Sequence, residues 1–294
     1  MATEELVNQA THDQPSDTEL VAYSVVPGAP AQPSPELPSI SVVIPAKNEG
    51  GNVEWVLQSM PRWIDEVILV DGNSTDGTVE VAKSQWPDLV VVGQKSPGKG
   101  AALREGFASA TGDIVVMIDA DGSMDPGEID RYVKPLIEDD CDVVKGSRWL
   151  AGGGSLDITP FRKFGNRMLL AIVNRLFGSR FTELCYGFMA FKRSCVERLA
   201  LTADGFEIET QIVVNALRAG LRVEEVASME APRRHGRSHL RPIRDGFRVL
   251  ATVLRALPRP ASNRDEGGLG QGSGSSESRS WRQSPGLDGL EGLE

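Results

Sequence analysis

Two aspartates, Asp119 and Asp121, follow the apolar run at residues 114–118 and are separated by a single residue. In an extended chain, residues two apart point to the same side. Both carboxylates can therefore converge on one small hard cation, Mg²⁺ or Mn²⁺, whose other ligands are oxygens of a second molecule such as a diphosphate. A simple turn after a buried strand is the alternative, because Asp and Gly are also common turn residues.

Apolar runs of strand length alternate with helix-like stretches from residue 39 to residue 147. The runs cover 40–44, 67–70, 89–92, 114–118 and 143–144. This alternation predicts an α/β fold with a mostly parallel central sheet and crossover helices. We expect the intervening helices to begin after a cap at Asn52, at Ser74-Thr-Asp-Gly77, at Gly98-Lys-Gly100 and around Pro126.

Polar residues follow three of the predicted strands. They are Pro45-Ala-Lys-Asn-Glu49, Asp71-Gly-Asn-Ser74 and Asp119-Ala-Asp121. In open parallel sheets, ligands bind beyond the carboxyl ends of the strands. The convergence of these three segments on one edge predicts a nucleotide site.

The segment Gly98-Lys-Gly100 has a competing interpretation as a dinucleotide-binding turn. That fingerprint needs a third glycine, but Leu103 stands there, and the segment follows the third strand instead of the first. The pattern therefore disfavours a dehydrogenase. Lys99, at a helix start, either meets a phosphate or is a solvated turn residue.

Five motifs together resemble the family 2 glycosyltransferases, in particular the dolichyl- or polyprenyl-phosphate mannose and glucose synthases. They are Val43-Ile-Pro-Ala-Lys-Asn-Glu49, Val70-Asp-Gly-Asn-Ser-Thr-Asp-Gly77, Asp119-Ala-Asp-Gly122, Gly146-Ser-Arg148 and Arg233-Arg-His-Gly-Arg-Ser-His-Leu240. The resemblance runs from Ser39 to Leu257 and implies the GT-A nucleotide-diphospho-sugar transferase fold, with a Rossmann-like N-terminal half.

The resemblance also implies a set of donor-binding residues: Pro45, Lys47, Glu49, Asp71, Lys99, Asp119, Ala120, Asp121 and Arg148. Pro45, Glu49 and Asp71 would hold the base and ribose. Asp119 and Asp121 would hold the metal, and Arg148 would meet the donor diphosphate.

Two motifs depart from the family pattern. Asp71-Gly72 stands where relatives often carry paired acids, which leaves one carboxylate for the base. Gly236-Arg-Ser-His239 stands where they usually read Gly-x-Ser-Lys. In this loop, which includes the predicted acceptor-binding residue Ser238, Arg237 or His239 would have to replace the lysine.

The expected catalytic residues are Asp121, Arg148 and Glu209. Metal and arginine would neutralise the leaving diphosphate. A lipid phosphate acceptor is already anionic and needs only cations to place it, for which Arg162 and Arg233 are the candidates. A hydroxyl acceptor needs a general base, which Glu209 would supply, with Glu207 and Glu183 as alternatives.

Residues 233–259 carry eight Arg and one acid, Asp245. Phe247, Leu250, Ala251, Leu254 and Leu257 recur at helical spacing opposite several of the arginines. The pattern fits a basic amphipathic helix on an anionic membrane surface, or a surface helix packed on the core. The apolar stretch at 168–177 is too short to span a bilayer and fits a core or interfacial helix. No aromatic-interleaved basic surface indicates nucleic-acid binding.

The net charge of -10 comes almost entirely from the two ends of the chain. Residues 1–38 and 260–294 are rich in acids, Pro, Gly and Ser and are predicted to be disordered. Between them we expect one glycosyltransferase domain, 39–259, with a nucleotide-sugar half (39–148) and an acceptor half (149–259) in which residues 152–155 are a hinge or a passive linker. Cys141, Cys185 and Cys195 lack metal-ligand spacing and suggest reduced, buried thiols in a cytosolic protein.

These observations predict an inverting, metal-dependent transferase that moves a hexose from GDP-mannose or UDP-glucose to a polyprenyl phosphate. The expected location is the cytoplasm, peripheral at the inner face of the membrane, with no transmembrane segment. Two alternatives stay open. One is the same fold glycosylating a soluble small molecule or polysaccharide, and the other is a catalytically silent nucleotide-sugar-binding protein.

Overall fold

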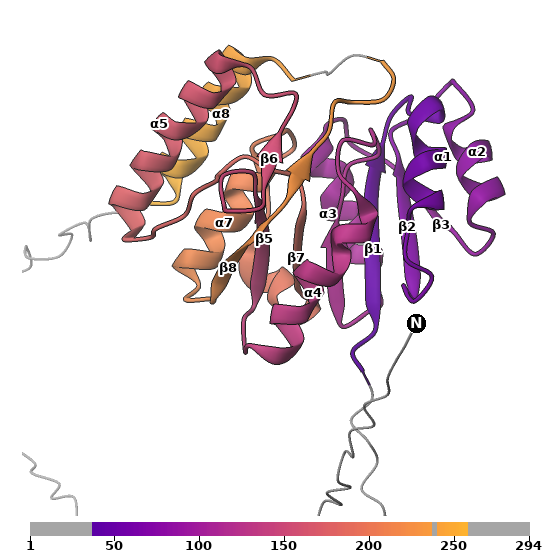
Figure 1. Cartoon of the computed structure of the whole chain (residues 1–294), viewed down its shortest axis with the longest axis horizontal. Coiled ribbons are helices and arrows are strands. Elements are labelled where there is room, and N and C mark those ends of the chain that lie inside the picture. Colours follow the sequence, from indigo (N-terminus) through magenta and orange to yellow (C-terminus); the bar gives the residue numbers. More distant parts are fainter. Residues whose placement is uncertain (1–36, 237–239, 258–294) are drawn as a thin grey trace, which may run out of the picture.

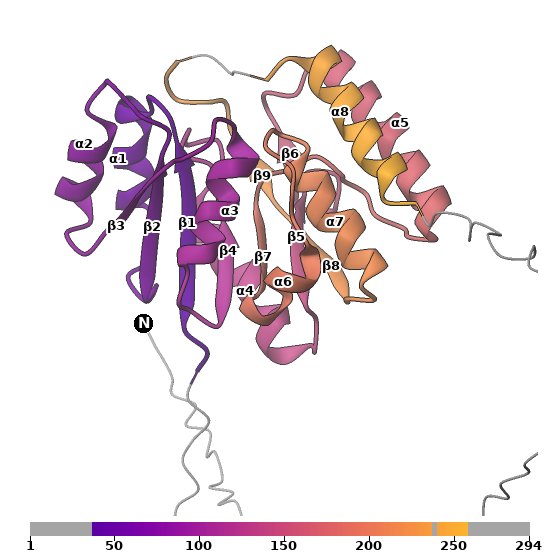
Figure 2. The same ribbon diagram turned by 180° about the vertical axis from the view of Figure 1, so that it is seen from behind.

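A seven-stranded sheet forms the centre of the computed structural model, which describes residues 37–236 and 240–257. Its strand order is β3-β2-β1-β4-β7-β5-β8 (Figures 1 and 2). The strands are β1 (Ile40–Ala46), β2 (Glu66–Asp71), β3 (Val90–Gly93), β4 (Ile114–Met117), β5 (Val143–Ser147), β7 (Met189–Lys192) and β8 (Val223–Ala227). Two short strands, β6 (Gly154–Ser155) and β9 (Met229–Glu230), pair separately.

All strands of the large sheet run in one direction except β7, which lies antiparallel between β4 and β5. The register brings Ala46 of β1 beside Asp71 of β2, and Asp71 beside Gly93 of β3. The loops after these strands therefore begin at the same edge of the sheet. The predicted mostly parallel α/β fold is confirmed.

The helices cover both faces of the sheet. They are α1 (Gly50–Gln58), α2 (Thr78–Gln85), α3 (Lys99–Ser109), α4 (Ile129–Glu138), α5 (Pro160–Phe177), α6 (Val196–Leu199), α7 (Ile208–Arg218) and α8 (Pro242–Arg255). Apolar side chains of α1, α2 and α4 belong to one hydrophobic cluster, and those of α3, α5, α6, α7 and α8 belong to another.

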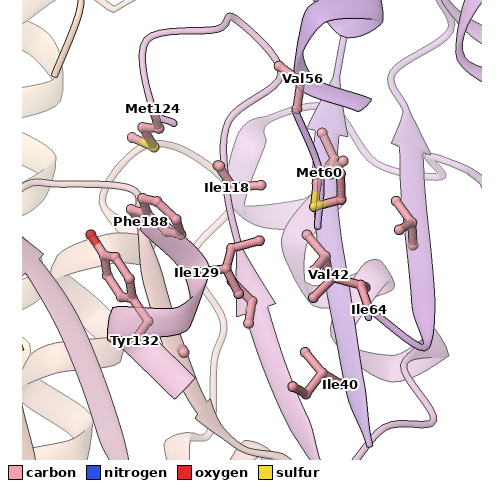
Figure 3. Close-up of a cluster of buried hydrophobic side chains, with 14 of the residues drawn as sticks. Ile40, Val42, Val56, Met60, Ile64, Ile118, Met124, Ile129, Tyr132 and Phe188 are labelled. Carbon is pink, nitrogen blue, oxygen red and sulfur yellow. The ribbon is translucent and has the colours of Figure 1, made fainter. Parts of the chain in front are cut away.

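Each central strand contributes to both clusters because successive side chains point to opposite faces. In β1, Val42 and Ile44 pack under α1, whereas Val43 packs under α3. Figure 3 shows part of the first cluster, where Tyr132 of α4 stacks on Phe188 with ring centroids 4.0 Å apart. Strands buried on both faces explain why the sequence shows continuous apolar runs.

Two features differ from the sequence-based expectation. Asn52 is not the cap of α1, which begins at Gly50; its buried side chain instead donates to Glu49 and exchanges hydrogen bonds with the backbone of His235. The apolar runs also predicted no strand beyond residues 143–144. Strands β7 and β8 of the acceptor half complete the sheet, so the two predicted halves share one sheet.

Helices α5 and α8 lie side by side at one end of the molecule in both views (Figures 1 and 2). Pro at the first turn of each favours a helix start, and Thr159 caps α5 by accepting from the backbone N–H of Arg162. Val173 of α5 and Val253 of α8 are buried in the second hydrophobic cluster. Both helices are thus anchored on the core.

Candidate active site

A cavity of about 690 Å³ opens at the carboxyl ends of the parallel strands. Its wall includes residues from the loops after β1, β2, β3 and β4, the first turns of α3 and α7, and the facing sides of α5 and α8. Ligand sites of proteins commonly have this size and position. Most residues predicted from sequence to bind the donor lie in this wall: Pro45, Lys47, Glu49, Lys99, Asp119, Ala120, Asp121 and Arg148.

Asp119 and Asp121 lie together in the cavity wall, with side chains 25% and 21% exposed. Burial, the largest effect, together with the negative charges of Asp121 and Glu209, raises the pKa of Asp119 to about 6. A cation beside the two aspartates would relieve this repulsion. Mg²⁺ is typically held by one or two carboxylates plus phosphate oxygens, and these two side chains fit that donor set.

In the part of the chain that the structure describes, no group of three or more His, Cys, Asp or Glu side chains could hold a metal ion. A divalent cation at Asp119 and Asp121 would therefore need ligands from a bound molecule. The arrangement suits a cation that binds together with a diphosphate.

Lys99 links Asp119 to Glu209. Its Nζ lies 2.6 Å from Oδ1 of Asp119 and 2.7 Å from Oε1 of Glu209, and all three side chains are largely buried. Burial alone would lower the pKa of Lys99, but the two carboxylates outweigh it and raise that pKa above its ordinary value. Lys99 is thus a fixed cation in the cavity wall, and the interpretation as a solvated turn residue is wrong.

The start of α3 is not a free anion site. The backbone N–H groups of Gly100 and Ala101 both donate to the carbonyl of Asp204, at 2.9 and 3.3 Å. A Cβ on Gly98 would lie 2.0 Å from that carbonyl oxygen, and a Cβ on Gly100 would lie 2.3 Å from the carbonyl of Ala203. The two glycines therefore permit close backbone packing, and the N–H groups of Gly100 and Ala101 are already used by the protein.

Glu49 forms a two-pronged ion pair with Arg233. Its carboxylate accepts from Nη1 at 2.6 Å and from Nη2 at 2.7 Å, and it also accepts from Asn52 at 2.6 Å. Burial raises the pKa of Glu49 above its ordinary value, although the bonds from Asn52 and the charge of Arg233 oppose the rise. The Nε of Arg233 is buried without a hydrogen-bond partner, 3.6 Å from Asp121.

The segment that carries Arg233 also binds the loop after β4 through its backbone. Ala231 N–H donates to the carbonyl of Ser123, and Arg234 N–H donates to that of Asp121. Arg234 lies over the Trp55 ring at 3.9 Å. The structure thus places Arg233, predicted for the acceptor, beside Glu49, predicted for the donor.

Arg148 is almost completely buried and all of its donor groups have protein partners. Nε donates to Glu183 at 2.7 Å, Nη1 to Glu230 at 2.9 Å, and Nη2 to the carbonyl of Cys185 at 3.1 Å. Glu230 also accepts from Ser155, in the glycine-rich segment predicted as a hinge or linker. The guanidinium therefore fixes the wall of the cavity, and its charge is balanced by two carboxylates.

Of the three glutamates considered as a base, only Glu209 lines the cavity. Glu183 is fully buried and is used by Arg148, Asn166 and the N–H of Leu184. Glu207 lies outside the wall and accepts from the N–H of Gly205 at 3.3 Å.

The remaining predictions are placed as follows. Asp71 is not in the wall, and both of its oxygens accept from the N–H of Ser74 at 3.2 Å. Arg162 on α5 lines the cavity, 3.7 Å from Asp157. Ser238 lies outside the described residues.

Several wall residues were not predicted, among them Gln94, Tyr186, Gly187, Phe206 and Glu230. Gly187 lies against the charged group, since an added Cβ would be 2.8 Å from Lys99 Nζ and 3.1 Å from an oxygen of Asp119. Tyr186 and Gly187 precede β7, Phe206 precedes α7 and Glu230 lies in β9, all in the half of the chain for which no strand was predicted, whereas Gln94 directly follows β3. No local sequence signal marked them.

Helices α5 and α8 each expose apolar side chains at helical spacing. Phe161, Phe164, Met168 and Leu176 are exposed on α5, and Ile243, Phe247 and Leu254 are exposed on α8. Arg244, Arg248 and Arg255 of α8 are exposed as well. Helix α8 therefore both packs on the core and presents the apolar and basic residues expected of an interfacial helix. Among the described helices, none has the length and apolar character needed to cross a membrane.

Comparisons with known proteins agree with this geometry. Residues 41–200 match the family model described as glycosyl transferase family 2. The chain is 33% identical to glycosyltransferase AglJ of Haloferax volcanii over 76% of this chain and 73% of that protein. It is 29% identical to a dolichol-phosphate mannosyltransferase of Pyrococcus furiosus over 74% of this chain and 63% of that protein.

Solved structures with the same fold include glucosyl-3-phosphoglycerate synthase from Mycobacterium tuberculosis. Its complex with phosphoglyceric acid matches with a TM-score of 0.62 and 28% identity, over 76% of this chain and 82% of that chain. Another structure of that synthase contains Mn²⁺, UDP and glucosyl-3-phosphoglycerate and matches with a TM-score of 0.61.

Proposed function

The chain belongs to glycosyltransferase family 2, and on that premise we propose that it moves a hexose from a nucleotide-diphosphate sugar to a polyprenyl phosphate, with inversion at the anomeric carbon. The observation that carries the proposal is the single cavity in which Asp119, Asp121 and Lys99 meet the facing sides of α5 and α8. The residues proposed for the donor and the sides of two helices that expose apolar residues thus border one cavity.

The donor end is the edge formed by the loops after β1, β2 and β4. Pro45, Glu49 and the Asp71-Gly-Asn-Ser74 turn support a base and ribose site at this edge, because their loops are bonded to one another. Asn48 accepts from the N–H of Thr75 at 2.9 Å, and the N–H of Gly72 donates to the carbonyl of Ala46 at 2.8 Å. GDP-mannose and UDP-glucose are the proposed donors.

Asp119 and Asp121 would hold Mg²⁺ or Mn²⁺ together with the donor diphosphate. The bound cation would neutralise charge that develops on the diphosphate as the sugar leaves. Lys99 holds the Asp119 carboxylate in place on the other side.

Protein cations would supply the rest of this stabilisation. Lys47 and Lys95 line the cavity, and no ion pair joins either of them to another described side chain. We assign them to the diphosphate. We assign Arg148 an indirect part, because Glu183 and Glu230 already use its charge.

The acceptor assignment rests on charge and exposure. A phosphate acceptor is already anionic and needs no general base, so Glu209 can remain paired with Lys99 at 2.7 Å. Arg162 lines the α5 end of the cavity, 3.7 Å from Asp157, and is the cation that we assign to the acceptor phosphate. The exposed apolar side chains of α5 and α8, with the arginines of α8, support docking on an anionic membrane surface.

A soluble phosphate-bearing acceptor is the second candidate. The similarity to a synthase whose structures contain phosphoglyceric acid favours it. Such an acceptor offers a hydroxyl as nucleophile, and Glu209 would then be the base. The two candidates therefore make opposite demands on Glu209.

Two measurements on the full chain test the proposal. Thermal shifts with UDP-glucose, GDP-mannose and UDP-N-acetylglucosamine, each with Mn²⁺ or with EDTA, identify the donor, because a ligand of the native state raises the Tm. Transfer of labelled sugar to polyprenyl phosphate or to 3-phosphoglycerate then identifies the acceptor. Product with the lipid alone supports the proposal, and product with phosphoglycerate alone selects the second candidate. Donor binding without any transfer would favour a catalytically silent protein.

A further inference from the structure

The cavity continues from the charged residues into a groove between α5 and α8. Phe161, Gly165 and Leu169 contribute the α5 wall at positions i, i+4 and i+8, which lie on one face of a helix. On α8 the wall is formed by Pro242, Gly246 and Val249. We refer to these six residues as the α5–α8 groove.

Two glycines line this groove, and neither a positive φ nor close packing requires glycine at their positions. Gly165 and Gly246 lie inside α5 and α8, where glycine is among the least favourable residues. Neither has a positive φ, and a Cβ added to either would meet nothing within 4 Å. By contrast, a Cβ on Gly106 of α3 would lie 2.3 Å from Val43. Gly165 and Gly246 both border open space that a larger side chain would fill.

The polar side chains beside the groove are occupied by the protein. Asn166 donates to Glu183 at 2.5 Å, and its oxygen accepts from the N–H of Cys185 at 3.3 Å. Asp245 accepts from the N–H of Arg241 at 2.7 Å. A ligand in this part of the cavity therefore meets mainly apolar surface.

The cavity wall carries an arginine at one end of the groove and is mainly apolar farther along it. Arg162 stands on α5 next to Phe161, at the start of the groove. Exposed Phe164 and Phe247 continue the apolar surface on the two helices outside the cavity. The fitting ligand is an amphiphile with an anionic head and an apolar chain.

Resting on the proposed function, we propose that the α5–α8 groove holds the isoprenoid chain next to the phosphate of the acceptor, and that Gly165 and Gly246 keep it open. The phosphate lies at Arg162, and the first isoprene units run between the helices toward the exposed aromatic residues. The groove thereby selects chain-bearing phosphates over small soluble ones.

The test compares acceptors of increasing chain length with the full-length protein. Phosphates carrying two and four isoprene units are offered with the donor identified by thermal shift, and kcat/KM is measured for each. Because each buried CH₂ favours binding, the wild type is expected to prefer the longer acceptor by about tenfold or more. Gly165→Leu and Gly246→Leu fill the groove and are expected to reduce this preference to less than about threefold, while the donor-induced thermal shift persists.

Ala171→Leu is the matched control, because Ala171 is exposed on α5 and lies outside the cavity wall. It adds the same leucine to the same helix and should keep the chain-length preference. If the wild type transfers sugar equally well to short and long acceptors, the role assigned to the groove is wrong, but the proposed transferase activity still stands. If the two leucine variants keep the preference for the longer acceptor, the groove assignment is also wrong. If the wild type transfers sugar to none of the acceptors, the proposed function itself is wrong. If one leucine variant fails to fold, the other leucine variant, compared with the wild type and with Ala171→Leu, still tests the groove.

Discussion

The ammonium group of Lys99 lies 2.6 Å from the carboxylate of Asp119, although the two residues are 20 positions apart in the chain. The contact joins the first turn of α3 to the loop after β4. It places a protein cation beside the carboxylate that is expected to share a metal with Asp121. Glu209 completes the group from α7.

Replacing Lys99 by Met should leave two buried carboxylates without their common cation. Removing one partner of a buried ion pair typically costs about 3–5 kcal/mol, so we expect a loss of this order in the free energy of unfolding, measured by urea titration. Lys99→Met combined with Glu209→Gln should recover part of the loss, because one uncompensated charge disappears. Equal stability of wild type and single variant would contradict the ion-pair assignment.

Replacing Asp121 by Asn should remove metal-dependent turnover with little effect on the fold. Among the described residues, the carboxylate of Asp121 accepts a hydrogen bond only from the N–H of Ser123 and lies 3.6 Å from Arg233, so its loss is tolerable. We expect kcat to fall about 100-fold or more, as when other groups that stabilise transition-state charge are removed. EDTA should have the same effect on the wild type. Full activity of the variant, with the Tm unchanged, would exclude Asp121 as a metal ligand.

Gly100 permits the close contact of α3 with residues 203–204, and Gly100→Ala should destabilise the protein. The new Cβ would lie 2.3 Å from a backbone carbonyl oxygen that cannot rotate away. Overpacking of this kind typically costs about 1–3 kcal/mol, which chemical denaturation can measure. Gly93→Ala is the control, since its Cβ would meet nothing within 4 Å. If both variants were equally stable, packing would not be the reason for glycine at position 100.

Phe247 is 68% exposed on α8, and Phe247→Glu should weaken membrane association. Burying one aromatic side chain in a lipid interface is worth about 1.5–3 kcal/mol, so binding to anionic liposomes should fall about tenfold or more in a sedimentation assay. Trp63→Glu is the control, because Trp63 is 49% exposed and belongs to neither α5 nor α8. An equal decrease in both variants would indicate a general effect of charge and not docking through α8.

The three cysteines should react slowly with thiol reagents in the native protein. Burial, the largest cause, raises the pKa of Cys185 to about 12 and that of Cys141 to about 11, and it also raises the pKa of Cys195. Only the thiolate reacts, so at pH 8 the reactive fraction of Cys141 is on the order of 0.1%. Titration with a chromogenic disulfide should detect three thiols in guanidinium chloride. Rapid native reaction would mean that these sites open readily.

The sequence alone determined the elements whose signals are local. Continuous apolar runs specified β1 to β5: β1, β2, β4 and β5 are buried on both faces and have no polar face, whereas β3 is a partly exposed edge strand with an apolar sequence. The residues that end β1 and β4 specified the donor edge, because the carboxyl ends of parallel strands meet at one side of a sheet. Five of the seven strands in the sheet were therefore predicted, and eight of the nine residues predicted to bind the donor line the cavity.

The tertiary structure decided which charges are available and which are already paired. Sequence reasoning assigned Arg148 to the diphosphate and Arg233 to the acceptor, but the fold pairs them with carboxylates from distant segments at Glu183 and Glu49. It also places β7 antiparallel inside the sheet and brings two helix glycines into one groove. These features depend on contacts between residues far apart in the chain, and local propensity and periodicity carry no information about such contacts.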